Sequence, residues 1–201
     1  MNANSNPLER RSRKAFTLIE LLVVIAIIAI LAGMGAYVYP RAIDQAKKTR
    51  TKALVSDLVN AVKAYQLEYN RLPVDPASDD STPIEFDGGE GAAILKVLIG
   101  ENTALGARTS ANPRETAFFK PDISSGVTIG MVFEGDDPVK LLDAWGKPIK
   151  IIMDADYNDK IPNPQSGGEP TNLRRQVIAW SEGSPSRELD NEWANNVKSW
   201  E

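Results

Sequence analysis

Hydrophobic residues follow three different patterns along the chain. The first is a run from Phe16 to Tyr39 in which almost every position is apolar and Glu20 is the one charged residue. Because the run is apolar on every face, it predicts a membrane-inserted helix and not a half-buried one. Its 24 residues would make a helix of about 36 Å, which is enough to cross a hydrocarbon core of about 30 Å.

The second pattern is an amphipathic helix over residues 40–72. Pro40 cannot donate a backbone hydrogen bond, so it predicts a bend in an otherwise continuous helix from about Thr17 to about Asn70. Apolar residues then return at helical spacing, which predicts a stripe that lies against a core. The stripe consists of Leu54, Leu58, Val62, Tyr65 and Tyr69.

The third pattern belongs to a globular domain over residues 73–201. Residues 73–91 are rich in Pro, Gly, Asp and Ser and predict a surface loop, and residues 92–99 predict a short second helix. The segments 127–133, 148–153 and 176–180 are short, β-prone and bounded by turn residues, so they predict strands. We therefore expect an α+β fold, in which a long N-terminal helix forms the spine of a small antiparallel sheet.

Composition excludes several kinds of chemistry. The 201 residues include no histidine and no cysteine, so the chain can form no Ser-His-Asp or Cys-His nucleophile system, no ordinary zinc site and no disulfide. The glycine-rich segment 88–91 lacks the Lys-Ser/Thr of a phosphate loop. We therefore predict that the protein is not an enzyme.

Charge divides the chain into a basic N-terminus and an acidic remainder. Residues 1–15 carry four Lys or Arg and one Glu, whereas residues 16–201 carry 19 basic and 26 acidic residues. An acidic body argues against nucleic-acid binding. A basic segment before an apolar run is typical of a targeting signal.

Glu20 is the unusual residue of the apolar run. A carboxylate in hydrocarbon costs about 2.5–3.5 kcal/mol at a helix centre and less near an interface. Either Glu20 lies close enough to the headgroups to reach water, or it pairs with a cation at the same depth. The run supplies no such cation, so in the second case the partner would come from another copy of the chain.

The segment from Arg13 to Leu31, which includes Ala15, Phe16, Thr17 and Glu20, resembles the N-terminal signal of type IV prepilins and type II secretion pseudopilins. The resemblance implies a cytoplasmic leader over residues 1–15, cleavage between Ala15 and Phe16 by a prepilin peptidase, and N-methylation of Phe16. It also implies that Glu20 is the assembly carboxylate. Ala15 stands where the family usually has Gly.

A second resemblance lies near the C-terminus. The segment Asp143-Ala144-Trp145-Gly146-Lys147-Pro148 is similar to the D-x-W-G-x-P turn of major-pseudopilin heads, and it predicts a turn that sets the sheet with Trp145 in the core. Residues 177–183 and 195–200 resemble the final strand and terminal loop of those heads. In the family that loop binds calcium, which implies a calcium site at Ser181, Asp190, Asn195 and Asn196, with Glu192 as a further oxygen donor.

A separate acidic segment over residues 154–159 has the D-x-D-x-N spacing of a calcium loop. It lacks the glycine at the sixth position and the glutamate at the twelfth. A solvated turn is the better interpretation of this segment.

The resemblance implies a structural subunit of a pilus-like filament, most closely a major pseudopilin of a type II secretion system. Its implied partners are further copies of the chain, the prepilin peptidase, an inner-membrane assembly platform and minor pseudopilins. The helix over residues 16–39 would cross the bacterial inner membrane or pack in the filament core, with the body on the periplasmic side. Alternatives are a type IV pilin for adhesion, motility or DNA uptake, an exported domain whose signal peptide is cut near Gly35-Ala36, and a permanently anchored sensor or enzyme.

Overall fold

A computed structural model of the chain describes residues 16–75, 78, 81–121, 129–165, 171–184 and 196–200, with only the backbone of residues 34–38. The chain divides into two units, residues 1–43 and 44–201. One long helix, α1 (Leu18–Tyr69), contributes to both units. Its ends lie within one or two residues of the predicted ones.

The described part of the first unit is helical and apolar. From Phe16 to Leu31 its large hydrophobic side chains are all exposed, from 46% at Val24 to 82% at Leu18. Among the residues described, none of the helices combines the length and apolar character required to cross a membrane. The predicted span over residues 16–39 stays a prediction.

The α1 segment of the second unit carries the predicted stripe. Leu58, Val62 and Tyr65 are fully buried, Leu54 is nearly so, and Tyr69 packs against the same core. The helix ends at Tyr69, and Asn70 has a φ of 54°, a left-handed conformation that commonly terminates a helix. The helical spacing of apolar residues in the sequence therefore predicted this part of α1 correctly.

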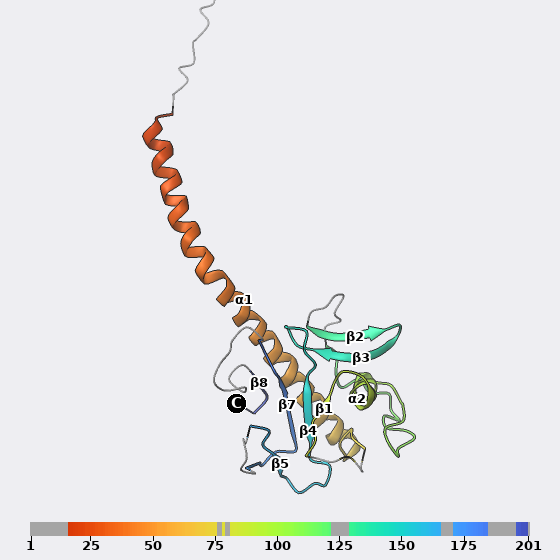
Figure 1. Ribbon diagram of the computed structural model, residues 1–201. Helices are drawn as coiled ribbons and strands as arrows, with labels where there is room; N and C mark the ends of the chain where they lie inside the picture. The colour runs from red at the N-terminus through yellow and green to blue at the C-terminus, as the bar shows by residue number, and fades with distance from the viewer. Residues whose placement is uncertain are drawn as a thin grey trace, which may run out of the picture. The chain divides into compact units, whose positions relative to one another are not determined.

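All strand pairs of the second unit are antiparallel (Figure 1). The main sheet has the order β1-β4-β7-β8, and two further two-stranded sheets are β2-β3 and β5-β6. With the helices α1 and α2 (Gly89–Ile99), these sheets make an α+β protein, as predicted. The strands are β1 (Ile84–Glu85), β2 (Gly130–Glu134), β3 (Asp137–Leu142), β4 (Lys150–Met153), β5 (Ile161–Pro162), β6 (Asn172–Leu173), β7 (Val177–Ser181) and β8 (Val197–Lys198).

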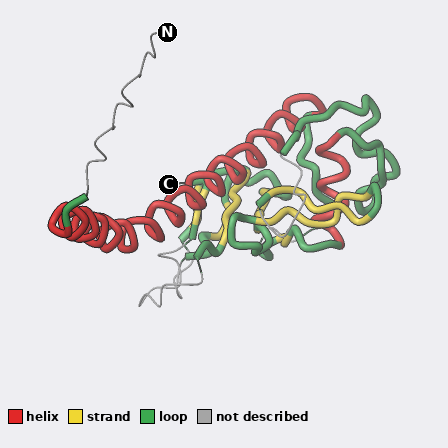
Figure 2. Tube along the Cα trace, turned by 90° about the horizontal axis from the view of Figure 1, so that it is seen from above, coloured by secondary structure: helices red, strands yellow, loops and turns green. Residues whose placement is uncertain are grey.

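Both faces of the main sheet carry apolar side chains. Successive side chains of a strand point to opposite faces, so β4 and β7 each contribute apolar residues to both. Ile151 and Met153 of β4 and Ala179 of β7 join the core that includes the stripe of α1. On the other face Ile178 and Trp180 form a smaller cluster with Trp200 packed against it. The indoles of Trp180 and Trp200 meet edge to face, with their centroids 5.9 Å apart. Figure 2 shows the strands gathered along one side of this part of α1.

Several predicted boundaries need correction. The second helix begins at Gly89, three residues before the predicted start, inside the stretch interpreted as loop. At Gly91 an added Cβ would lie 2.3 Å from the carbonyl oxygen of Glu85, so only glycine fits between this helix and β1. The strands predicted at 148–153 and 176–180 correspond to β4 and β7. The strand predicted at 127–133 corresponds to β2, although residues 127 and 128 lie outside the described part.

Candidate functional site

The first candidate site is the start of α1, where Thr17 and Glu20 cap the helix reciprocally. The backbone N–H and the hydroxyl of Thr17 each donate to Oε2 of Glu20, both at 2.8 Å. The N–H of Glu20 donates in turn to Oγ1 of Thr17 at 3.3 Å. This is a capping box, which satisfies backbone donors that have no partner inside the helix.

This arrangement gives Glu20 a partner in its own chain, in addition to any partner from another copy. The signal was present, because Thr17 and Glu20 have the T-x-x-E spacing of a capping box. The other oxygen of Glu20, Oε1, accepts no hydrogen bond from a described residue. Phe16 is 73% exposed beside it, whereas Ala15 lies outside the described residues. The assignments of Ala15, Phe16 and Glu20 to processing and assembly stay predictions.

The second candidate site is the turn that joins β3 to β4, organised by the buried carboxylate of Asp143. Its Oδ1 accepts the backbone N–H groups of Trp145 and Lys147, both at 2.8 Å. Its Oδ2 accepts the hydroxyl of Ser181, which lies on β7. Gly146 has a φ of 82°, which a residue with a Cβ seldom adopts. The predicted turn therefore exists, and Asp143 holds it closed.

The same turn contacts α1. The N–H of Ala144 donates to the buried hydroxyl of Thr51 at 3.1 Å. The indole N–H of Trp145 donates to Oδ1 of Asp44 at 3.3 Å. Trp145 is only half-buried, so its predicted place in the core is wrong. An indole N–H in the core would need a buried acceptor, and here it reaches one at the helix surface.

An ion-pair network borders this turn. Lys150 lies 2.9 Å from carboxylate oxygens of both Glu85 and Glu182, and Lys147 lies 3.2 Å from Glu182. Partial burial lowers the pKa of Lys150, but the hydrogen bonds that Lys150 donates to Glu182 and Glu85 raise it, and the net shift is upward. The hydrogen bond from Lys150 lowers the pKa of Glu182 against a smaller effect of burial. The network joins β1, β4 and the end of β7.

The residues predicted to hold calcium are only partly within the described structure. Asp190, Asn195 and the further donor Glu192 lie outside it. Ser181 is buried. Its Oγ accepts the N–H of Gly183 at 2.9 Å, and its hydroxyl donates a hydrogen bond to Asp143. Asn196 directly precedes β8. Within the described ranges no three acidic side chains cluster as metal ligands would, so the calcium site stays a prediction.

The D-x-D-x-N segment forms a tight turn in which carboxylates accept backbone N–H groups. Oδ1 of Asp154 accepts the N–H of Asn158 at 3.1 Å, and its Oδ2 accepts that of Asp159 at 2.8 Å. Burial raises the pKa of Asp154, and a hydrogen bond from Asp154 lowers the pKa of Asp156. These bonds use the oxygens that a cation would need. The segment is a turn, as predicted, but Asp154 is fully buried and only residues 156–159 of it are exposed to solvent.

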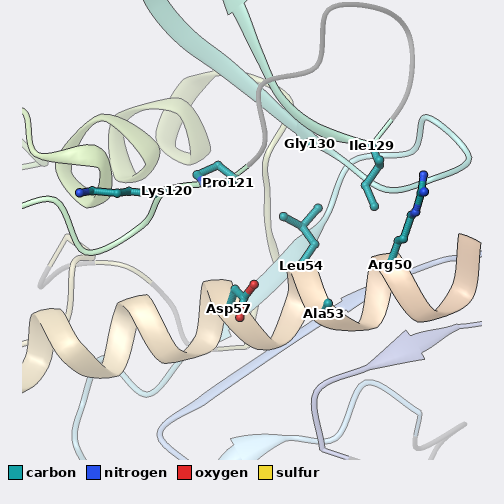
Figure 3. Close-up of a pocket in the computed structure, with 8 residues that line it drawn as sticks. All are labelled: Arg50, Ala53, Leu54, Asp57, Lys120, Pro121, Ile129 and Gly130. Carbon is teal, nitrogen blue, oxygen red and sulfur yellow. The ribbon is translucent and has the colours of Figure 1, made fainter.

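A hollow of about 430 Å³ lies beside α1 near the start of β2 (Figure 3). Its walls carry the cations Arg50 and Lys120 and the carboxylate of Asp57. None of the site residues predicted from the sequence lines it. Its residues are Arg50, Ala53, Leu54, Asp57, Lys120, Pro121, Ile129 and Gly130.

Comparison with known proteins supports the N-terminal signal and the resemblance to type II secretion pseudopilins. The prokaryotic N-terminal methylation motif matches residues 10–36. The chain is 38% identical over 69 residues to the type II secretion system core protein G of Aeromonas hydrophila, a match that covers 33% of this chain and 46% of that protein. The match thus spans less than half of the relative's length. No solved structure matches the chain. The predicted resemblance to pilin-like proteins and pseudopilins is confirmed.

Proposed function

We propose that this chain, which carries the N-terminal signal of the pilin-like proteins, is a structural subunit of a pilus-like filament and serves as the major pseudopilin of a type II secretion system. The observation that carries the proposal is the methylation motif over residues 10–36, which includes the exposed apolar start of α1 with its single carboxylate. The similarity to a type II secretion core protein favours secretion over a surface pilus for adhesion, motility or DNA uptake. The role is structural and not catalytic.

The exposed apolar surface of residues 16–31 supports the membrane part of the proposal. A soluble monomer rarely exposes a continuous apolar surface of this kind, because burying it is favourable. Two environments would cover it, namely lipid before assembly and the helices of other subunits afterwards. We infer that α1 passes from the inner membrane into the filament core, with residues 1–15 in the cytoplasm and the body in the periplasm.

The mechanism begins with cleavage between Ala15 and Phe16, which creates a positively charged amine at the start of the helix. Glu20 already uses Oε2 for Thr17, so its Oε1 is available to the amine of a neighbouring copy. In a dry filament core an unpaired carboxylate is costly, and removing one partner of a buried pair leaves the other uncompensated. The pair therefore sets the register of subunits and makes correct packing favourable.

The head must be held firmly to α1 if the filament is to transmit force, and the Asp143 turn supplies such a connection. It contacts α1 through Thr51 and Asp44, and β7 through Ser181. We infer that α1 is the spine of the head. The remaining partners in this proposal are the prepilin peptidase, the inner-membrane assembly platform and minor pseudopilins.

The decisive test is Glu20→Ala in cells that contain the complete secretion machinery. We expect the variant to remain in the membrane as monomer and to yield at least about tenfold fewer filaments, because each pairing in the core would leave a charge without a partner. Glu20→Gln should behave in the same way if charge is the operative property. Asp57→Ala, which removes an exposed carboxylate from the same helix, is the control and should assemble normally.

Mass spectrometry of the purified mature chain tests the first step. A start at Phe16 with one added methyl group supports the proposal. A start near residue 36 would instead indicate an ordinary signal peptide, and an intact leader would indicate a permanent anchor. Normal filaments from Glu20→Ala would refute the assembly mechanism even if processing is as expected.

A further inference from the structure

Several cations of α1 lack a partner within the described chain. Lys47, Lys48, Arg50 and Lys63 take part in no ion pair among the described residues. Ion pairs within the described head connect acidic residues with Lys96, Arg114, Lys140, Lys147 and Lys150. Lys48 and Lys63 contribute to none of these pairs.

Two of these cations, Lys48 and Lys63, are exposed on the side of α1 that does not pack against the core. We call the exposed residues Gln45, Lys48, Thr49, Lys52 and Lys63 the outer helix face. The burial of the residues shows that the outer helix face is exposed, and Figure 2 shows the strands along one side of this segment of α1. A shallow hollow of about 340 Å³ lies on it and is lined by Lys48, Lys52, Ser56 and their neighbours.

The rest of the chain has the opposite charge. Residues 41–63 carry six Lys or Arg and two Asp, a net charge of +4. Residues 64–201 carry 13 Lys or Arg and 23 Asp or Glu, a net charge of −10. An acidic body is repelled by an anionic lipid surface, but it is complementary to the basic segment of a second copy.

One exposed acidic feature of the described head is the turn between β2 and β3. Its residues Glu134, Gly135, Asp136 and Asp137 are all exposed. Asp137 pairs with Lys96 at 2.5 Å, whereas Glu134 and Asp136 form no ion pair with a described residue. We call this turn the acidic hairpin.

We propose that the outer helix face of one copy binds the acidic hairpin of a second copy, through Lys48 on one side and Glu134 and Asp136 on the other. This inference rests on the proposed filament function. The two surfaces differ from each other, so the contact is heterologous, and a heterologous contact that does not close into a ring produces an open helical polymer. Charge complementarity at such a contact sets orientation and register more than affinity.

The test is a charge swap in the full chain, with sheared filaments quantified by sedimentation. Lys48→Glu, and separately Glu134→Lys with Asp136→Lys, should each reduce the assembled fraction about five- to tenfold, because each places like charges in contact. The three substitutions together should restore assembly to within about twofold of wild type. Thermal melting confirms that each variant folds.

A crosslinking test locates the contact directly, because the chain has no cysteine of its own. Lys48→Cys combined with Asp136→Cys should give a ladder of oxidised oligomers in filaments. The control is Lys48→Cys combined with Arg174→Cys, which is also exposed but lies outside the hairpin and should give no ladder.

The outcomes separate the two proposals. If the wild-type chain forms no filaments, the proposed function fails. If filaments form but the swap does not rescue assembly and no ladder appears, the proposed contact is overturned while the filament function stands. If only the reversal of Lys48 matters, and it abolishes binding of the chain to phosphatidylglycerol vesicles, the helix face binds lipid and the contact is likewise overturned.

Discussion

Asp143 is the residue on which the stability of the head depends most sharply. It is fully buried, and its two oxygens accept two backbone N–H groups and one hydroxyl. Asp143→Ala removes all three acceptors at once. Trp145 and Lys147 are half-buried, so water can partly hydrate their backbone N–H groups once the acceptor is gone. The hydroxyl of Ser181, in contrast, is left without its acceptor in a buried site.

The size of the effect follows from these three bonds. A buried donor left without a partner costs about 1–3 kcal/mol, and partial rehydration at the two half-buried residues reduces the total to about 3–5 kcal/mol. For a unit of this length, each kcal/mol shifts Tm by about 2–4 °C. We therefore expect Tm to fall by about 6–20 °C. Asp143→Asn keeps one carbonyl acceptor and should lose about half as much.

The assay is thermal unfolding of the full chain in detergent micelles, followed by near-ultraviolet circular dichroism. All four tryptophans lie at residue 145 or later, so this signal reports the head and not the apolar segment. Asp57→Ala is the matched control, since it removes an exposed carboxylate and should change stability by no more than about 0.5 kcal/mol. If Asp143→Ala melts within 2 °C of wild type, roughly the effect of 1 kcal/mol, the three bonds do not hold the turn and this reasoning is wrong.

Three further predictions concern the helix start, acid stability and calcium. Thr17→Val removes the hydroxyl of the capping box and should weaken the first turn by about 0.5–2 kcal/mol, seen as faster hydrogen exchange of the amides of residues 18–20; unchanged exchange would contradict it. The folded pKa of Glu182 is lowered, so its stabilising effect on the head is complete above the unfolded pKa of about 4.3 and is lost as pH falls through the folded pKa. Glu182→Gln should therefore reduce the fall of Tm below about pH 5. If Tm of the variant falls with acid as steeply as that of wild type, the ion-pair network does not stabilise the head. If the predicted calcium loop binds the ion, the head should be stabilised by about 2.7 kcal/mol at a calcium concentration a hundredfold above Kd. Equal Tm values in calcium and in chelator would show that the calcium prediction is wrong.

The sequence was most informative where a long periodic pattern was present. The apolar stripe from Leu54 to Tyr69 was predicted correctly. The spacing of apolar residues on a helix depends on local backbone geometry, so it can be recognised without knowing the tertiary structure. Strand β3 was missed because Asp137 and Pro138 begin it and charged Lys140 lies in its middle, so its alternation is obscured. The strands β1, β5, β6 and β8 have two residues each, too few to show any period.

The candidate sites divide in the same way. The capping box joins residues three apart in the sequence, so its spacing could have been recognised. The bond between Asp143 and Ser181 joins residues 38 apart, and only the pairing of β4 with β7 brings the two chain segments together. Trp145 was placed in the core because of its size, whereas its position is set by the need of the indole N–H for the carboxylate of Asp44.

The contrast between Asp143 and Glu20 explains why one acidic residue is structural and the other is suited to the proposed assembly role. Asp143 has both oxygens engaged by its own chain in a buried site, so a second partner would have to displace an existing donor. Glu20 engages Oε2 alone, on an exposed apolar surface. Its Oε1 can accept a cation without disturbing the cap that orders the first turn. The helix can therefore be formed before assembly and still gain a charge-assisted bond when a second copy arrives, and this gain is largest where water is excluded.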